Sequence, residues 1–203
     1  MGVIRIILFL LGALIVAIAG FAVYLGALKS VTVERSQFGP VSFVYGTHTG
    51  PYSKLSESWT AFLETAATRG VDTCHSLAVY LDPPGAPDDQ KRTLLGCRID
   101  AMDESMKTAP LATMPSFELP ASEALTSTFP FKNVASFWVG PMKVYPEMTK
   151  ELDAAGVAPS ISVELYGHVD VNGVAGEFSE IGFVMPLDAD PAMVAALKAA
   201  FAD

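Results

Sequence analysis

The stretch PSISVELYGHVD, residues 159–170, alternates apolar and polar positions. Successive side chains of a strand point to opposite faces of a sheet, so this period predicts a strand. Val163 and Leu165 fall on one face, and Glu164 and Tyr166 fall on the other. The polar face is either solvated or lines a pocket around Glu164.

Other short apolar and β-branched stretches, bounded by Gly, Pro and Asp, predict further strands. They cover residues 41–48, 75–82, 93–100, 123–131 and 177–187, with shorter candidates within 31–40 and around Phe117. Apolar positions spaced three and four apart predict helices instead. These cover residues 52–69, a stretch from about Met142 to Gly156, and residues 190–203. Pro141 and Pro146 leave the start of the second helix open, because proline interrupts a helix interior.

The strand that carries Glu164 has a counterpart earlier in the chain. SLAVYLD (76–82) and SISVELY (160–166) share Ser, Val and Leu at the same places. This match, with the order of the elements, predicts an α+β fold built from a duplicated β-α-β-β unit. The two repeats cover about residues 41–100 and 123–187. Tyr80 occupies the place in the first repeat that Glu164 occupies in the second, so we expect both side chains to face one cleft.

The N-terminus carries a long apolar run. Residues 6–28 contain no charge, and as a helix they would be about 34 Å long, enough to cross the hydrocarbon core of a bilayer. A cleaved signal peptide has a shorter apolar region, whereas here the apolar sequence continues past Ala17 and Ala19. We therefore expect an uncleaved single-pass transmembrane anchor at residues 1–29, followed by one domain at residues 30–203.

The side of the membrane on which the domain lies is left open. Arg5 and the terminal amine flank one end of the apolar run, and Lys29 and Arg35 flank the other. The positive-inside rule therefore gives nearly equal weight to both orientations.

The domain after the anchor is acidic. All 22 Asp and Glu residues, and 11 of the 13 Lys and Arg residues, follow Lys29, which gives this part a formal charge of −11. Nucleic acid and anionic lipid both attract basic surfaces, so this charge excludes a nucleic-acid partner and argues against binding to anionic lipid. The same charge disfavours self-association, and we expect a soluble, monomeric domain.

The chain has two cysteines, Cys74 and Cys97, both in stretches that read as strands. They could form a disulfide, although buried free cysteines are common. If residues 75–81 and 93–99 pair symmetrically, Cys97 lies opposite residue 77 rather than residue 74. This offset argues against a bridge, and the redox state of the compartment is left open.

The polar face around Glu164 is the candidate site. On a solvated sheet face these side chains would simply contact water. In a cleft, a carboxylate about 4 Å from a ligand cation would contribute about 4 kcal/mol at an effective dielectric of about 20, and an aromatic face roughly 0.5–2 kcal/mol. His48, His75 and His168 lie in separate strands without metal-ligand spacing, so we expect no metal site and no cofactor. Motifs of nucleotide binding are absent, and no residue is assigned a catalytic role.

Several stretches, in their order along the chain, resemble the GyrI-like or bacterial effector-binding domain over residues 41–203. The matching motifs are YGTHTGPY (45–52), LAVYLDPPG (77–85), SVELY (162–166) and EIGFVMPL (180–187). TFPFKNVASFW (128–138) and the N-terminal helix are similar to the membrane-anchored, testis-expressed ER-phagy receptor type of this family. The resemblance implies a duplicated fold with a cleft, shared with SOUL-type haem-binding proteins, and a buried ligand-binding Glu at the place of Glu164.

The resemblance also implies functions. GyrI-like regulators bind small, often cationic, aromatic molecules, and some relatives hydrolyse strained cyclopropane compounds with such a Glu. This chain has no helix-turn-helix domain, so we do not expect a drug-sensing transcription regulator. It ends at Asp203, directly after the domain, so we do not expect the receptor activity that depends on a disordered tail.

Our leading interpretation is a membrane-anchored module that binds a small molecule, or a protein partner, in the cleft between the repeats. One alternative is a membrane adaptor or receptor with a vestigial cleft, and another is a hydrolase of electrophilic small molecules. The candidate ligand-binding residues are Glu164, Tyr80, Tyr166, Tyr52 and Trp138.

Overall fold

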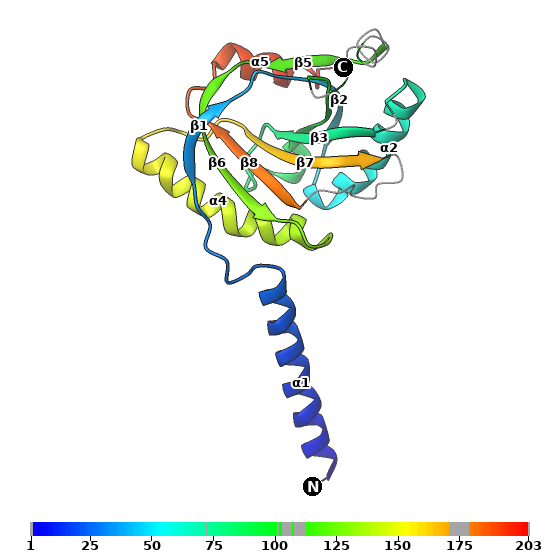
Figure 1. The fold of residues 1–203 in the computed structure, drawn as a ribbon, viewed down its shortest axis with the longest axis vertical. Helices are drawn as coiled ribbons and strands as arrows, with labels where there is room; N and C mark the ends of the chain where they lie inside the picture. Colours follow the sequence, from blue (N-terminus) through cyan, green and yellow to red (C-terminus); the bar gives the residue numbers. More distant parts are fainter. Residues whose placement is uncertain are drawn as a thin grey trace.

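A computed structural model describes residues 2–71, 73–100, 102, 107, 113–170 and 179–202 (Figure 1). The helices are α1 (Gly2–Tyr24), α2 (Leu55–Thr68), α4 (Ser136–Ala155) and α5 (Pro191–Ala199). The strands are β1 (Glu34–Phe38), β2 (Val41–Thr49), β3 (Thr73–Tyr80), β4 (Arg92–Arg98), β5 (Ser116–Leu119), β6 (Ser122–Pro130), β7 (Ser162–Asp170) and β8 (Glu180–Pro186). The expected α+β class is therefore confirmed. Residues 177 and 178, assigned to the last strand from the sequence, lie outside the described residues.

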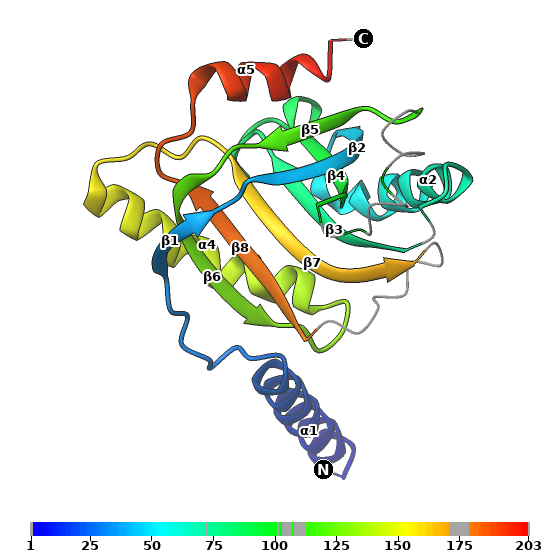
Figure 2. The ribbon, with the colours of Figure 1, turned by 45° about the horizontal axis from the view of Figure 1, so that its top comes forward.

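The eight strands form one antiparallel sheet in the order β1-β6-β8-β7-β3-β4-β2-β5. The sheet curls into a half-barrel (Figure 2). Strands β3 and β7, which carry Tyr80 and Glu164, pair with each other near the middle of the sheet. The chain runs β2-α2-β3-β4 and then β6-α4-β7-β8, the order that a duplication would give. The duplication itself stays a prediction.

The two faces of the sheet bury different sets of side chains. One face packs with α5, and its buried residues include Phe43, Leu77, Leu94, Val163 and Leu197. The opposite face is covered by α2 and α4 (Figure 1). The helices contribute Phe62, Leu63, Ala66, Val144, Met148 and Leu152 to that side. Glu164 lies on a strand between these two helices, so its surroundings depend on both.

Helix α4 begins at Ser136 and includes both prolines, so the prolines do not mark its start. It ends at Gly156, whose φ of 68° is the left-handed conformation that glycine adopts without strain. Gly140 faces the sheet, where an added Cβ would lie 3.2 Å from Phe183 Cζ and 3.3 Å from Phe129 Cδ1. The missing side chain therefore lets α4 approach the sheet closely, one turn before Tyr145.

Helix α1 is long and apolar enough to span a membrane, and it extends away from the rest of the molecule (Figure 1). It ends at Tyr24, four residues before the predicted end of the span at Leu28. The chain turns at Gly26, which has a φ of 92° and lies against the ring of Phe129. The last residues of the apolar run therefore contact the domain instead of extending the helix.

Cys74 and Cys97 form a disulfide, so the expectation against a bridge is wrong. Cys97 pairs with Ser76, which places Cys74 two residues from the opposing position and on the same face. Such diagonal neighbours are usually about 7–8 Å apart. The Cα atoms of Cys74 and Cys97 lie closer, 5.3 Å apart, which is within the range of a disulfide.

Candidate functional site

Glu164 is buried on the helix-covered face of β7, with 3% of its surface exposed. The residue opposite it on β3 is Ala78, and the residue opposite it on β8 is Phe183. Tyr80 lies two residues further along β3 and therefore on the same face.

Tyrosine hydroxyls satisfy both oxygens of this carboxylate. Tyr145 of α4 donates to Oε1 and Tyr166 of β7 donates to Oε2, each over 2.7 Å. The Tyr80 hydroxyl lies 3.2 Å from that of Tyr166, and the Ser162 hydroxyl lies 3.4 Å from that of Tyr145. These five residues, called the Glu164 cluster below, form one hydrogen-bonded network.

Burial raises the pKa of Glu164 above its ordinary value of 4.5, although the hydrogen bonds from Tyr145 and Tyr166 act in the opposite direction. Burial also raises the pKa values of Tyr80, Tyr145 and Tyr166 well above 10, and the charge of Glu164 adds to this. The tyrosines therefore remain protonated donors at neutral pH. Among the described residues no Lys, Arg or His forms an ion pair with Glu164.

Aromatic rings surround the cluster. The ring of Tyr166 makes edge contacts with Trp59 of α2 and Phe137 of α4, with centroid separations of 6.1 Å and 5.5 Å. Tyr145 contacts Phe183 in the same way at 5.5 Å. Aromatic faces carry partial negative charge, so this wall suits a cation as well as an apolar ring.

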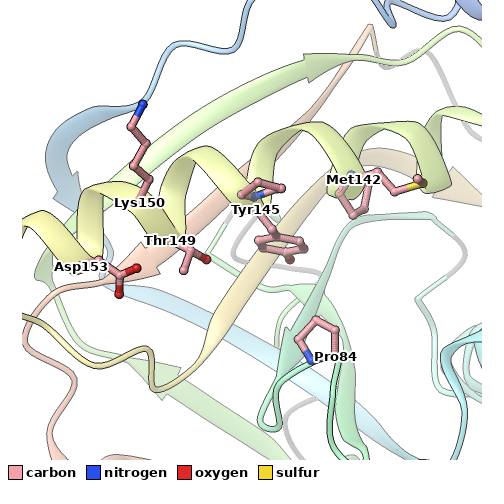
Figure 3. Close-up of a pocket in the computed structure, with 8 residues that line it drawn as sticks. Pro84, Met142, Tyr145, Thr149, Lys150 and Asp153 are labelled. Carbon is pink, nitrogen blue, oxygen red and sulfur yellow. The ribbon is translucent and has the colours of Figure 1, made fainter.

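A groove of about 590 Å³ opens on the outer side of α4 (Figure 3). Its lining is mainly apolar and comprises Pro84, Pro141, Met142, Tyr145, Pro146, Thr149, Lys150 and Asp153. Pro84 comes from the loop between β3 and β4, and it lies across the groove from α4 (Figure 3). Tyr145 belongs to both sites: its ring lines the groove, and its hydroxyl contacts Glu164. Only the Tyr145 side chain therefore separates the buried Glu164 carboxylate from this groove, among the described residues.

The structure brings together three of the five residues proposed from the sequence, namely Glu164, Tyr80 and Tyr166. Tyr52 lies beside them, 5.2 Å from the ring of Tyr80. Its hydroxyl donates to the Asp82 carbonyl over 2.8 Å. Burial, with the nearby charges of Asp82 and Glu164, raises the pKa of Tyr52 to about 12.

Trp138 lies apart from the cluster, on the outer surface of α4, with 58% of its surface exposed. The side chain of His168 lies outside the part of the chain that the structure describes. Tyr145 and Ser162 were not among the proposed residues. Tyr145 shares the helical spacing of Met148 and Leu152, which are buried against the sheet. A tyrosine hydroxyl on the buried side of a helix needs a polar partner, and this requirement is the sequence signal that could have identified Tyr145 as a site residue.

No family model matches the chain. The human protein named Testis-expressed protein 264 is 26% identical to it over 162 residues, which are 75% of this chain and 50% of that protein. The chain thus spans about half the length of this relative.

Solved structures share the fold of the domain. The C-terminal domain of EcmrR has a TM-score of 0.52 and 11% identity, and the match covers 79% of this chain and 99% of that domain. A putative bacterial transcription regulation protein from Staphylococcus aureus MU50 has a TM-score of 0.50 and 12% identity, with 79% and 100% of the two chains covered. At this level of identity the comparison shows the fold alone.

Proposed function

We propose that this chain is a single-pass membrane protein of the GyrI-like family whose domain binds a small aromatic cation at the Glu164 cluster. The likeness to Testis-expressed protein 264 and to the C-terminal domain of EcmrR supports the family. The apolar helix α1 supports the anchor, with the domain starting near residue 30. The order of the elements supports an origin of the domain by duplication.

The observation that carries the proposal is a buried carboxylate without a counter-charge. Glu164 is 3% exposed, and its oxygens accept hydrogen bonds only from neutral hydroxyls among the described residues. Leaving a charge in such a position is costly, and a structural role would be met by an apolar residue. A ligand cation would supply the missing charge, because the attraction at about 4 Å amounts to about 4 kcal/mol at an effective dielectric of about 20.

The groove provides the route and the apolar contact area. Its volume of about 590 Å³ is in the range of small-molecule sites. Tyr145 separates it from Glu164, so a ligand in the groove reaches the carboxylate when the Tyr145 side chain moves aside.

Calorimetric titration of the detergent-solubilised full chain with tetraphenylphosphonium tests the proposal. We expect Glu164→Gln to weaken binding about tenfold or more, since the loss of a charged partner costs about 1.5–3 kcal/mol. Glu147→Gln is the matched control, because Glu147 lies on α4 with 51% of its side chain exposed. Equal affinities of the wild type and Glu164→Gln would rule the proposal out.

A further inference from the structure

The large hydrophobic side chains exposed outside α1 are concentrated in one place. Among the described residues after Leu28 they are Val134, Trp138 and Met142, which are 71%, 58% and 76% exposed. Val134 lies in the turn that enters α4, and Trp138 and Met142 follow at intervals of four residues. Residues four apart lie on one side of a helix, so the three form a single apolar stripe.

The stripe lies beside the point where α1 meets the domain. Lys143, the neighbour of Met142, donates from Nζ to the carbonyl of Ala27 over 2.9 Å. Leu25 is buried, and Gly26 lies against Phe129 of β6. Both views of the ribbon show the first turns of α4 near the end of α1 (Figures 1 and 2). These contacts hold the first part of α4 close to the residues that follow α1.

We propose that the stripe of Val134, Trp138 and Met142 inserts into the headgroup region of the bilayer that α1 spans, an inference that rests on the proposed anchoring. Each headgroup layer is about 5–8 Å thick, and five residues of helix, the separation of Trp138 from Lys143, rise about 7.5 Å. The Lys143–Ala27 contact therefore keeps Trp138 and Met142 within about that distance of the end of the apolar run along α4.

The composition of the stripe indicates the kind of lipid surface. Tryptophan concentrates at membrane–water interfaces, where its apolar ring and its N–H both find partners. The stripe contains no charge, and the domain has a formal charge of −11, so attraction to anionic lipid does not hold it there. Apolar contact with a zwitterionic lipid surface holds the stripe at the membrane instead. Met142 also lines the groove, so the mouth of the groove lies next to the lipid.

Fluorescence of Trp138 in reconstituted full-length protein tests the insertion. The chain has two tryptophans, and Trp59→Phe leaves Trp138 as the sole emitter. In vesicles of phosphatidylcholine brominated on its acyl chains we expect quenching of Trp138, protection from aqueous iodide, and no dependence on salt. The matched control is Trp138→Phe, in which the part-buried Trp59 reports on the domain and should not be quenched by the brominated lipid.

The outcomes separate this inference from the anchoring on which it rests. Flotation of the vesicles after a high-salt wash tests the anchor, and protein left at the bottom of the gradient would contradict both. If the protein floats with the vesicles but iodide still quenches Trp138, the proposed insertion of the stripe is wrong and the proposed anchoring is not. Protection from iodide without quenching by the brominated lipid would also overturn it, because a second protein copy would then cover the stripe.

Discussion

The central residue of this molecule is a carboxylate placed where charge is unfavourable. Glu164 sits between two helices and accepts hydrogen bonds from Tyr145 and Tyr166. Burial outweighs these bonds, so its pKa is raised. A group whose pKa is higher in the folded state stabilises the fold below the unfolded pKa, and that stabilisation is lost as the pH rises through the folded value.

The first prediction concerns this pH dependence. Between the ordinary pKa of 4.5 and the raised one, the wild-type free energy of unfolding should fall with rising pH, whereas that of Glu164→Gln should fall less. Denaturant titrations of both proteins over this range measure the difference. A wild type that becomes more stable than the variant as the pH rises would show that the carboxylate is not destabilised by burial.

The second prediction concerns Tyr145. Tyr145→Phe removes a hydrogen bond that lowers the pKa of Glu164, so this pKa should rise further. A cation binds the ionised carboxylate, and its affinity should therefore increase with pH. The midpoint of that increase should move to higher pH in the variant, at a stability cost of about 1–2 kcal/mol. Calorimetric titrations across a pH series measure the midpoint, and calorimetric unfolding measures the stability. If the midpoint does not move in the variant, Tyr145 does not lower the pKa of Glu164.

At the scale of elements, the sequence predicted the strands well and the contacts between elements poorly. The alternation around Val163 and Glu164 identified β7, because a two-residue period is a local signal. The start of α4 could not be placed, since Pro141 and Pro146 suggested a break that tertiary packing overrides. The outward position of Trp138 could not be predicted either, because Trp138 and Met142 are apolar and continue the spacing of Tyr145 and Met148.

The third prediction tests the close approach of α4. Gly140→Ala should destabilise the protein by up to about 2 kcal/mol, because overpacking typically costs about 1–3 kcal/mol and the gain in helix propensity offsets about 1 kcal/mol of it. The rings of Phe129 and Phe183 are buried and have little room to move. Tyr145 should shift with α4, so phosphonium affinity should also fall.

Gly85→Ala is the control for this substitution, since nothing lies within 4 Å of an added Cβ there. Thermal unfolding and calorimetry of the two variants give the comparison. If Gly140→Ala were as stable as the wild type and bound the phosphonium equally well, the position of α4 would not depend on Gly140.

At the scale of the whole molecule, the disulfide and the anchor bear on where the protein resides. The Cys74–Cys97 bridge could not be predicted from a local pattern, because it depends on the register of two paired strands. Disulfides persist in oxidising compartments. With α1 as the proposed anchor, we therefore expect the domain to face the oxidising side of the membrane, an orientation that the charges around α1 left open.

The fourth prediction follows from this bridge. In protein isolated from membranes, both cysteines should react with an alkylating reagent only after unfolding and reduction. Replacing both with serine should lower the free energy of unfolding by about 2–4 kcal/mol. Mass spectrometry and denaturant titration measure these effects. Alkylation of the unfolded, unreduced protein would show that the cysteines are free and that the domain faces a reducing compartment.

The fifth prediction tests the binding of a cation by Glu164 most directly, through two ligands of nearly the same shape and opposite charge. Tetraphenylphosphonium and tetraphenylborate both fit an apolar site, but a buried carboxylate attracts the first and repels the second. We predict that the full chain binds the phosphonium about tenfold or more tightly than the borate, a difference of about 1.4 kcal/mol or more. This preference should disappear in Glu164→Gln. Borate binding as tight as phosphonium binding in the wild type would contradict the account.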